Sequence, residues 1–288
     1  MGFWAKHFKL YQALKRMGIR DPRYILGHGS QSEMEKSISE IRRNSITDFG
    51  GFKMDLSPES PQDISYNVWR LNGIGYEKET AMLFRKSVKK TDTFLDIGSN
   101  SGYFALSMAG LCDRVMAFEP MPDVYRRLEA NIKLNNFRNV QAFNIAVSDK
   151  KEKTTFYMDE HNDGGGSLSA GRQSEAERKP IEIQTDTLDN ILNGHKADVI
   201  KIDTEGFEYE VLKGGTKTIG QARLIVFEHN MEVMAHRGAH IEKNQVIKLL
   251  EQNGFSVRSI NANGTPGKEL HDYKDAPGLA MNLCAIRS

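Results

Sequence analysis

The sequence predicts one doubly wound α/β domain preceded by a short N-terminal helical extension. Three observations predict this fold class. Apolar strand-like segments alternate with helical segments from residue 93 onward, a glycine-rich turn joins the first of these strands to its helix, and polar residues follow four of the strands. Alternating strands and helices form a mostly parallel sheet with helices on both faces. A chain of 288 residues is long enough to bury such a core.

We expect residues 1–50 to form the extension and residues 51–288 the α/β domain. Apolar residues recur at helical spacing among lysines and arginines in residues 1–20, which predicts an amphipathic helix. We expect this helix to pack on its own domain or to form a homodimer contact rather than to bind a membrane surface. Residues 21–50 are polar and rich in turn formers, and Phe52, Met54 and Leu56 alternate as in a strand.

The elements that follow are justified by apolar periodicity and by the residues that end each segment. Predicted helices are 62–72, 76–89, 103–110, 124–132 before Asn135-Asn136, 207–212 before Gly214-Gly215, and 242–252. Predicted strands are 93–97, 115–118, 140–147, 199–202, 224–227, 255–260 and 279–286.

One long polar insertion, residues 159–180, interrupts this order. The flanking segments Thr154–Met158 and Ile181–Thr185 alternate in strand fashion and are expected to pair as a hairpin. Glycine hinges and hydrogen-bonding side chains within the insertion favour a lid that closes over the acceptor. A surface loop without that role is the alternative.

The composition excludes several classes of partner. Lys+Arg 39 against Asp+Glu 38 leaves a net charge of +1, which provides no general attraction to nucleic acid and fits a small-molecule or neutral glycan acceptor. Two distant cysteines, Cys112 and Cys284, predict neither a disulfide framework nor a zinc site and indicate a reducing, cytoplasmic compartment. No apolar run approaches the roughly 20 residues of a transmembrane segment, and the N-terminus lacks the apolar core of a signal peptide.

Polar residues at the strand ends should converge on one rim of the sheet, because ligands of doubly wound folds bind at the carboxyl ends of the strands. The first group, Asp96–Gly102, stands just before a helix. Its glycines permit a close approach, and the helix N-terminus offers free N–H groups to a carboxylate. This suits the methionine end of S-adenosylmethionine (SAM). Glu119 ends the second strand, where a carboxylate can accept both hydroxyls of a ribose.

A nicotinamide-dependent oxidoreductase is a competing interpretation of this turn. Its fingerprint requires glycines spaced G-x-G-x-x-G. Asn100 and Tyr103 occupy the second and third glycine positions here, and Asp96 stands where it would approach a pyrophosphate. A P-loop is excluded because no Gly-Lys-Ser/Thr occurs in the turn. The turn therefore favours SAM, with a glycine turn of purely structural use as a further alternative.

Three segments of the chain resemble the FkbM family of SAM-dependent methyltransferases. They are Phe94–Tyr103 (FLDIGSNSGY), Ala117–Pro120 (AFEP) and Val199–Gly206 (VIKIDTEG). The resemblance extends from about residue 50 to about residue 260, and the IKIDTEG segment is its most specific part. It implies a Rossmann-like, seven-stranded methyltransferase sheet whose last strand is antiparallel. It also implies SAM as cofactor and O-methylation of a sugar, a glycan or a polyketide-type small molecule.

Carried over residue by residue, the resemblance implies a set of cofactor-binding residues. Those expected to hold the methionine part of SAM are Asp96, Gly98, Ser99, Asn100, Gly102 and Tyr103. Glu119 would hold the ribose, and Ala146 and Val147 would border the adenine. Ser99 is a departure, because the family often has alanine after the first glycine.

The methyl group of SAM is already activated, so the enzyme mainly has to align the acceptor. A hydroxyl acceptor also needs a base that takes its proton. Glu205 is the first candidate, and His229 is the second because its ordinary pKa lies nearest neutrality. Asp203 is expected to touch SAM rather than to take the proton. The alternative role of Glu205 is to cap the helix that starts near Glu208.

Two further alternatives stay open at this point. Asp203, Glu205 and Glu228 could hold a hard cation, but carboxylates often cluster at a strand rim without metal, and we expect none. The chain could also be a catalytically silent SAM-fold binding protein whose N-terminal extension is the interface. The intact glycine loop and the rim acids favour an enzyme.

Overall fold

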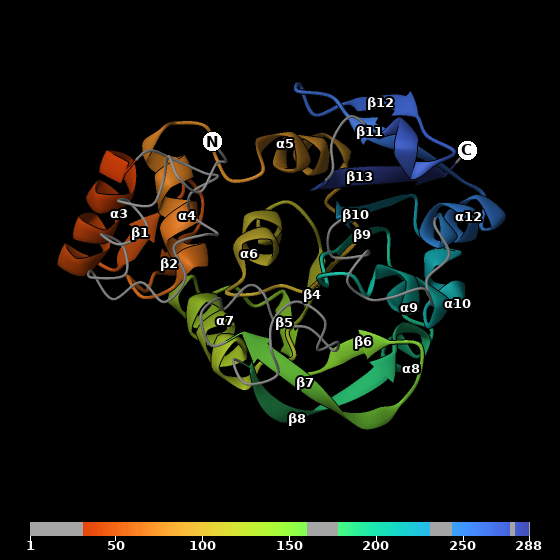
Figure 1. Cartoon of the computed structure of the whole chain (residues 1–288), viewed down its shortest axis with the longest axis horizontal. Coiled ribbons are helices and arrows are strands. Elements are labelled where there is room, and N and C mark those ends of the chain that lie inside the picture. Colours follow the sequence, from red (N-terminus) through yellow and green to blue (C-terminus); the bar gives the residue numbers. More distant parts are fainter. Residues whose placement is uncertain (1–30, 160–177, 231–243, 277–279, 288) are drawn as a thin grey trace, which may run out of the picture.

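A computed structural model describes residues 31–159, 178–230, 244–276 and 280–287 of the chain. Its centre is a mixed sheet of eight strands in the order β12-β11-β13-β10-β9-β3-β4-β5 (Figure 1). The strands of this sheet are β3 (Thr93–Ile97), β4 (Arg114–Phe118), β5 (Val140–Phe143), β9 (Val199–Ile202), β10 (Leu224–Asn230), β11 (Phe255–Ile260), β12 (Pro266–Glu269) and β13 (Ala280–Arg287).

The sheet confirms the predicted doubly wound topology. Strands β5, β4, β3, β9 and β10 pair in parallel, and the last strand, β13, is antiparallel to both β10 and β11. The expected number of strands was seven, but the short strand β12 pairs with β11 and adds an eighth at the edge. Parallel pairing brings the carboxyl ends of β3, β4, β9 and β10 to one rim.

The helices cover both faces of this sheet. They are α3 (Gln31–Arg43), α4 (Pro61–Leu71), α5 (Lys78–Ser87), α6 (Tyr103–Ala109), α7 (Pro122–Leu134), α8 (Leu188–Leu192), α9 (Glu208–Lys213), α10 (Thr216–Ile219) and α12 (Gln245–Gln252), with a 3-10 turn η2 (Tyr273–Asp275). Within the described ranges, none of them combines the length and the apolar content needed to cross a membrane.

Two apolar cores lie on opposite faces of the sheet, because successive side chains of a strand point to opposite sides. One core joins Phe94, Val199 and Val226 to helices α5 and α6. The other joins Ile200 and Phe227 to helices α9, α10 and α12, which lie on the other side of the sheet in Figure 1. The same alternation decides which charged side chains can meet at the rim.

The N-terminal part of the described chain is more ordered than its composition suggests. Helix α3 occupies part of the segment 21–50 expected to be irregular, because Met34, Ile38 and Ile41 recur at helical spacing and are buried. A hairpin of β1 (Ile46–Asp48) and β2 (Lys53–Asp55) follows.

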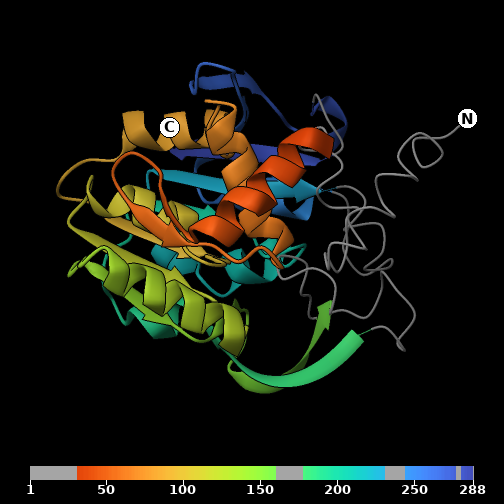
Figure 2. The same ribbon diagram turned by 90° about the vertical axis from the view of Figure 1, so that its left-hand side faces the viewer.

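The hairpin joins the N-terminal part to the rest of the fold. The domain boundary expected between residues 50 and 51 falls between its two paired strands, so a division there would separate strands that fold as one unit. Figure 2 shows the hairpin beside α7, where Asn131 Oδ1 accepts from Asp55 N at 2.7 Å. The predicted helix of residues 1–20 lies outside the described residues.

The segment expected to be one strand over 140–147 is divided between two sheets. Strand β5 ends at Phe143, and β6 (Ala146–Ser148) joins a separate three-stranded sheet in the order β6-β8-β7. The chain turns away at Asn144, whose side-chain Nδ2 donates to the backbone oxygens of Glu119 and Pro120 at 2.8 and 3.0 Å. Apolar alternation alone does not mark this departure.

The hairpin predicted from the alternation of 154–158 and 181–185 is confirmed. Strands β7 (Glu152–Asp159) and β8 (Arg178–Thr187) pair antiparallel, with Thr154 opposite Ile183 and Met158 opposite Lys179. Residues 160–177, which contain nearly all of the segment expected to form a lid, lie outside the described residues.

Candidate active site

The turn that follows β3 is held between the ends of β4 and β9. The N–H groups of Gly98 and Ser99 both donate to Phe118 O at 3.0 Å, and Ser99 Oγ donates to Asp96 O at 2.7 Å. Gly98 has φ +82°, and a Cβ at this position would lie 1.8 Å from Asp203 O. Glycine is therefore required by the protein's own packing, and Ser99 directs its hydroxyl into the turn.

Asp96 caps the helix behind this turn. Its Oδ2 accepts from Ala105 N at 2.8 Å, which satisfies one of the free N–H groups at the start of α6. Its Oδ1 is buried and has no hydrogen-bond partner among the described residues. Burial raises the pKa of Asp96 to about 6, although the neighbouring Lys201 opposes the rise. An unsatisfied buried carboxylate oxygen fits a site for a cationic ligand group.

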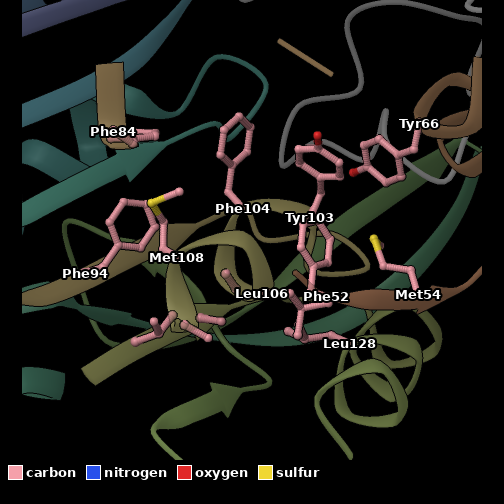
Figure 3. Close-up of a cluster of buried hydrophobic side chains, with 14 of the residues drawn as sticks. Phe52, Met54, Tyr66, Phe84, Phe94, Tyr103, Phe104, Leu106, Met108 and Leu128 are labelled. Atoms are coloured by element: carbon pink, nitrogen blue, oxygen red, sulfur yellow. The ribbon is translucent and has the colours of Figure 1, made fainter. Parts of the chain in front are cut away.

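The remaining residues of the turn, from Asn100 to Tyr103, differ in their backbone conformation and in their contacts. Asn100 has φ +50° and its N–H donates to Glu119 Oε2 at 3.0 Å. Gly102 begins α6 with φ +102°. The ring of Tyr103 stacks on Tyr66 at 5.0 Å between centroids and meets Phe52 edge-on at 5.5 Å (Figure 3). The Tyr103 side chain is thus part of the aromatic core.

Glu119 ends β4 as the sequence predicts. Its Oε2 accepts from Asn100 N and its Oε1 from Met121 N at 2.9 Å, and the residue is 6% exposed. The carboxylate therefore fixes the glycine turn from the end of β4. Its predicted role as the ligand of the ribose hydroxyls stays a prediction.

Glu119→Ala should weaken SAM binding by roughly 2–4 kcal/mol, because two charge-assisted hydrogen bonds to the ribose would be lost. Titration calorimetry measures this effect directly. Asn144→Ala is the matched control, since it removes contacts to the backbone of the same turn and leaves the carboxylate in place. Affinity within twofold of wild type in Glu119→Ala would exclude the ribose role.

Ala146 and Val147 follow the end of β5 in strand β6, and both are buried. Val147 packs in the core that contains Leu188, and Ala146 packs with Met121 and Val124. Their predicted place beside the adenine stays a prediction.

The turn after β9 is built around Glu208. Its Oε1 accepts from Thr204 N at 3.1 Å, from Thr204 Oγ1 at 3.0 Å and from Gly206 N at 3.1 Å. Glu205 stands within this turn in a left-handed conformation, φ +54°, and is partly buried. Glu208 thus fixes the turn that precedes α9, and the capping role considered for Glu205 stays an alternative.

Glu208→Ala should lower the free energy of unfolding by roughly 1–3 kcal/mol, because backbone N–H groups of Thr204 and Gly206 would lose their acceptor in a buried turn. Denaturant unfolding monitored by circular dichroism tests this. Glu210→Ala serves as the control from the same helix. Equal stability of Glu208→Ala and wild type would show that the turn does not depend on this carboxylate.

A buried lysine in β9 is the residue that sequence reasoning missed. Lys201 Nζ lies 2.7 Å from Asp203 Oδ2, and its side chain is 3% exposed. Glu77, at the N-cap of α5, accepts from Asn282 Nδ2 at 2.6 Å. Burial raises the pKa of Glu77 to about 6 against the opposing effect of Lys201. A lysine inside an apolar strand could have predicted the cluster, since such a charge is rarely buried without partners.

Strand β10 continues to Asn230, so Glu228 and His229 lie inside the strand rather than beyond its end at 227. They pair with Asn282 and Met281 of β13. Glu228 shares the face of Val226, on which Lys201 and Asp203 also lie. Burial, together with the charges of Glu205 and Asp203, raises the pKa of Glu228 well above its usual range.

His229 points to the opposite face of the sheet. Its ring stacks on Tyr273 at 3.9 Å between centroids with an interplanar angle of 13°, and the residue is 1% exposed. Burial lowers its pKa to about 4, so the ring is neutral at physiological pH. The structure therefore brings Asp96, Asp203 and Glu228 to one face and separates His229 from them.

Metal ligation by Asp203, Glu205 and Glu228 was the other use considered for the rim acids. Within the parts of the chain that the structure describes, no group of three or more His, Cys, Asp or Glu side chains is placed to hold a metal ion.

The chain is similar to several known methyltransferases. The hexuronic acid methyltransferase AglP of Haloferax volcanii is 25% identical over 226 residues, which cover 77% of this chain and 86% of the relative. The 2-O-methyltransferase NoeI of Sinorhizobium fredii is 26% identical over 49% of this chain and 65% of its own length. The crystal structure of methyltransferase FkbM from Methylobacillus flagellatus KT aligns with 98% of this chain and 59% of that chain, at 12% identity and a TM-score of 0.46.

The chain also matches a known protein family over one continuous region. Residues 96–257, more than half of the chain, match the methyltransferase FkbM domain. The matched region begins at Asp96 of the glycine turn and includes Glu119, the β9 turn and β10. This chain belongs to the FkbM family of SAM-dependent methyltransferases.

Proposed function

We propose that this protein transfers a methyl group from SAM to a hydroxyl of a sugar, a glycan or a polyketide-type small molecule. The observation that carries the proposal is the convergence of Asp96, Glu119, Asp203 and Glu205 at the carboxyl ends of three adjacent strands. The relatives named for a hexuronic acid and for 2-O-methylation support an oxygen acceptor on a sugar.

The residues present fit the cofactor. The unpartnered Asp96 Oδ1 is suited to the methionine ammonium group, and the glycine turn before α6 is suited to the carboxylate. Glu119 would receive the ribose hydroxyls, with Ala146 and Val147 beside the adenine. When bound, SAM supplies a methyl group activated by its sulfonium charge.

Glu205 is the residue that we assign to the proton of the acceptor. The acceptor oxygen would bond to the methyl carbon as the methyl–sulfur bond of SAM breaks and S-adenosylhomocysteine leaves, and the acceptor's proton would pass to the Glu205 carboxylate. Its left-handed turn at the end of β9 is hydrogen-bonded to Glu208, whose Oε1 accepts from Thr204 N and Gly206 N. Asp203, whose Oδ2 is bound to Lys201 Nζ, is assigned to the cofactor instead.

Incubation of the purified chain with methyl-labelled SAM and a panel of glycosides tests the proposal. Mass spectrometry of the products should show addition of one methyl group on oxygen to at least one sugar. If the chain binds SAM but transfers its methyl group to no acceptor in the glycoside panel or in a cell extract, the catalytically silent alternative is favoured. Preferred binding of NADH would restore the oxidoreductase interpretation.

Three expectations from the sequence stay predictions. They are a cytoplasmic location, a small-molecule rather than nucleic-acid acceptor, and a homodimer formed through the N-terminal extension. Light scattering of the full chain and of a chain that lacks residues 1–30 would test the last of these.

A further inference from the structure

Lys201 is a charged residue at the centre of the sheet. It stands in β9 between β3 and β10, and its neighbours in the strand, Ile200 and Ile202, are fully buried. Its side chain lies on the face of α6, with Nζ 4.8 Å from the centre of the Phe104 ring. A lysine in such a place is retained only where its charge is compensated.

Three carboxylates compensate this charge. Asp203 directly follows the same strand, Asp96 comes from β3 and Glu77 from the N-cap of α5. Burial lowers the pKa of Lys201, but these carboxylates outweigh burial and raise it above its usual range. The lysine is therefore charged, and it links the ends of two neighbouring strands to helix α5.

Asp96 lies opposite Lys201 in the parallel pairing of β3 with β9. One oxygen caps α6 and the other is buried without a partner among the described residues. Burial is the main influence that raises its pKa to about 6, and Lys201 is the main influence that lowers it. Loss of the lysine would therefore raise the pKa of Asp96 further and favour the protonated carboxyl, which pairs less well with an ammonium group.

We propose that Lys201 is a positioning residue for methyl transfer, whose buried ammonium group binds the Asp203 carboxylate and stands opposite Asp96 in the strand pairing, so that both carboxylates are placed to receive the methionine end of SAM. This inference rests on the assignment of Asp96 to the methionine ammonium group. Other charged groups near this face are Glu77 of α5 and Glu228 of β10, and Glu228 is itself influenced by Glu77, Asp203, Glu205 and Glu208.

The test is the pH dependence of affinity for S-adenosylhomocysteine, which carries the same methionine end and cannot be turned over. In wild type the affinity should weaken below a midpoint near pH 6, where Asp96 gains its proton. Lys201→Met should move the midpoint upward. Each pH unit of that move weakens the apparent affinity about tenfold at pH values below both midpoints.

Asp203→Asn is the control of opposite sign, because the charge of Asp203 raises the pKa of Asp96. Its midpoint should move downward. Titration of the ligand's own amine is common to all variants and cancels when they are compared. A purely structural role for Lys201 would instead lower affinity by the same factor at every pH.

Lys201→Met leaves carboxylates unpaired in the core, and it can fail to fold for that reason. The double variant Lys201→Met/Asp203→Asn removes the ion pair as a whole, and its midpoint should lie above that of Asp203→Asn. Equal midpoints in the double variant and in Asp203→Asn would overturn the inference. Absence of a midpoint near pH 6 in wild type would overturn it as well. A wild-type chain that binds neither SAM nor S-adenosylhomocysteine would refute the proposed function itself.

Discussion

Gly98→Ala should abolish methyl transfer and weaken SAM binding by about a hundredfold or more, because the turn that receives the methionine end can no longer rest against β9. The added Cβ would lie 1.8 Å from Asp203 O, at a φ of +82° that alanine rarely adopts. Backbone strain and overpacking together should cost roughly 2–4 kcal/mol of unfolding free energy. A displacement of about 1 Å in a positioning group can by itself cost about a hundredfold in rate.

Gly110→Ala is the matched control for this variant. Gly110 stands at the other end of the same helix, α6, with φ −77° and nothing within 4 Å of an added Cβ. It should bind SAM and unfold as wild type does. Calorimetry and denaturant unfolding of both variants separate the effects on binding and stability. Wild-type affinity in Gly98→Ala would contradict the assignment of this turn to the cofactor.

Glu205→Gln should lower turnover by about 10²–10⁴-fold while SAM affinity stays nearly unchanged, because only the transfer of the acceptor's proton is lost. The substitution keeps the size of the side chain and removes its basicity. The turn should survive, since Glu208 supplies the hydrogen bonds to Thr204 N and Gly206 N. Single-turnover rates with a saturating acceptor measure the chemical step.

Glu210→Gln is the control for charge in the same segment, because it removes a carboxylate from α9 without touching the turn that Glu208 stabilises. It should retain wild-type turnover. Full activity in Glu205→Gln would refute the role of base and direct attention to Glu228, which lies on the same face as Asp203. Loss of activity together with loss of folded structure would indicate that Glu205 stabilises the turn.

The sequence by itself determined those features that depend on short-range pattern. Periodicity placed β3, β4 and β9 within a residue of their observed bounds, because a strand buried on both faces is mostly apolar and stands out from the polar segments around it. The acid, the glycines and the following helix identified the turn at Asp96–Gly102. Its position at the end of the second strand identified Glu119 as the expected ribose ligand. The family resemblance supplied the antiparallel last strand, which pairs as expected.

The tertiary structure alone decided which faces and partners these residues have. The division of 140–147 between two sheets and the extension of β10 to Asn230 depend on pairing with β8 and β13, which lie far along the chain. That extension directs His229 away from Asp203 and brings Glu228 to its side.

Dependence on long-range pairing also explains why the sequence pattern does not predict the charged group around Lys201. Asp96, Lys201 and Glu77 are separated by many residues in the sequence, and no local pattern relates them. Only the parallel pairing of β3 with β9, and the packing of α5 against their face, brings the three charges together. Ionisation in a buried site depends on every charge nearby, so the chemistry of this rim is a property of the folded chain.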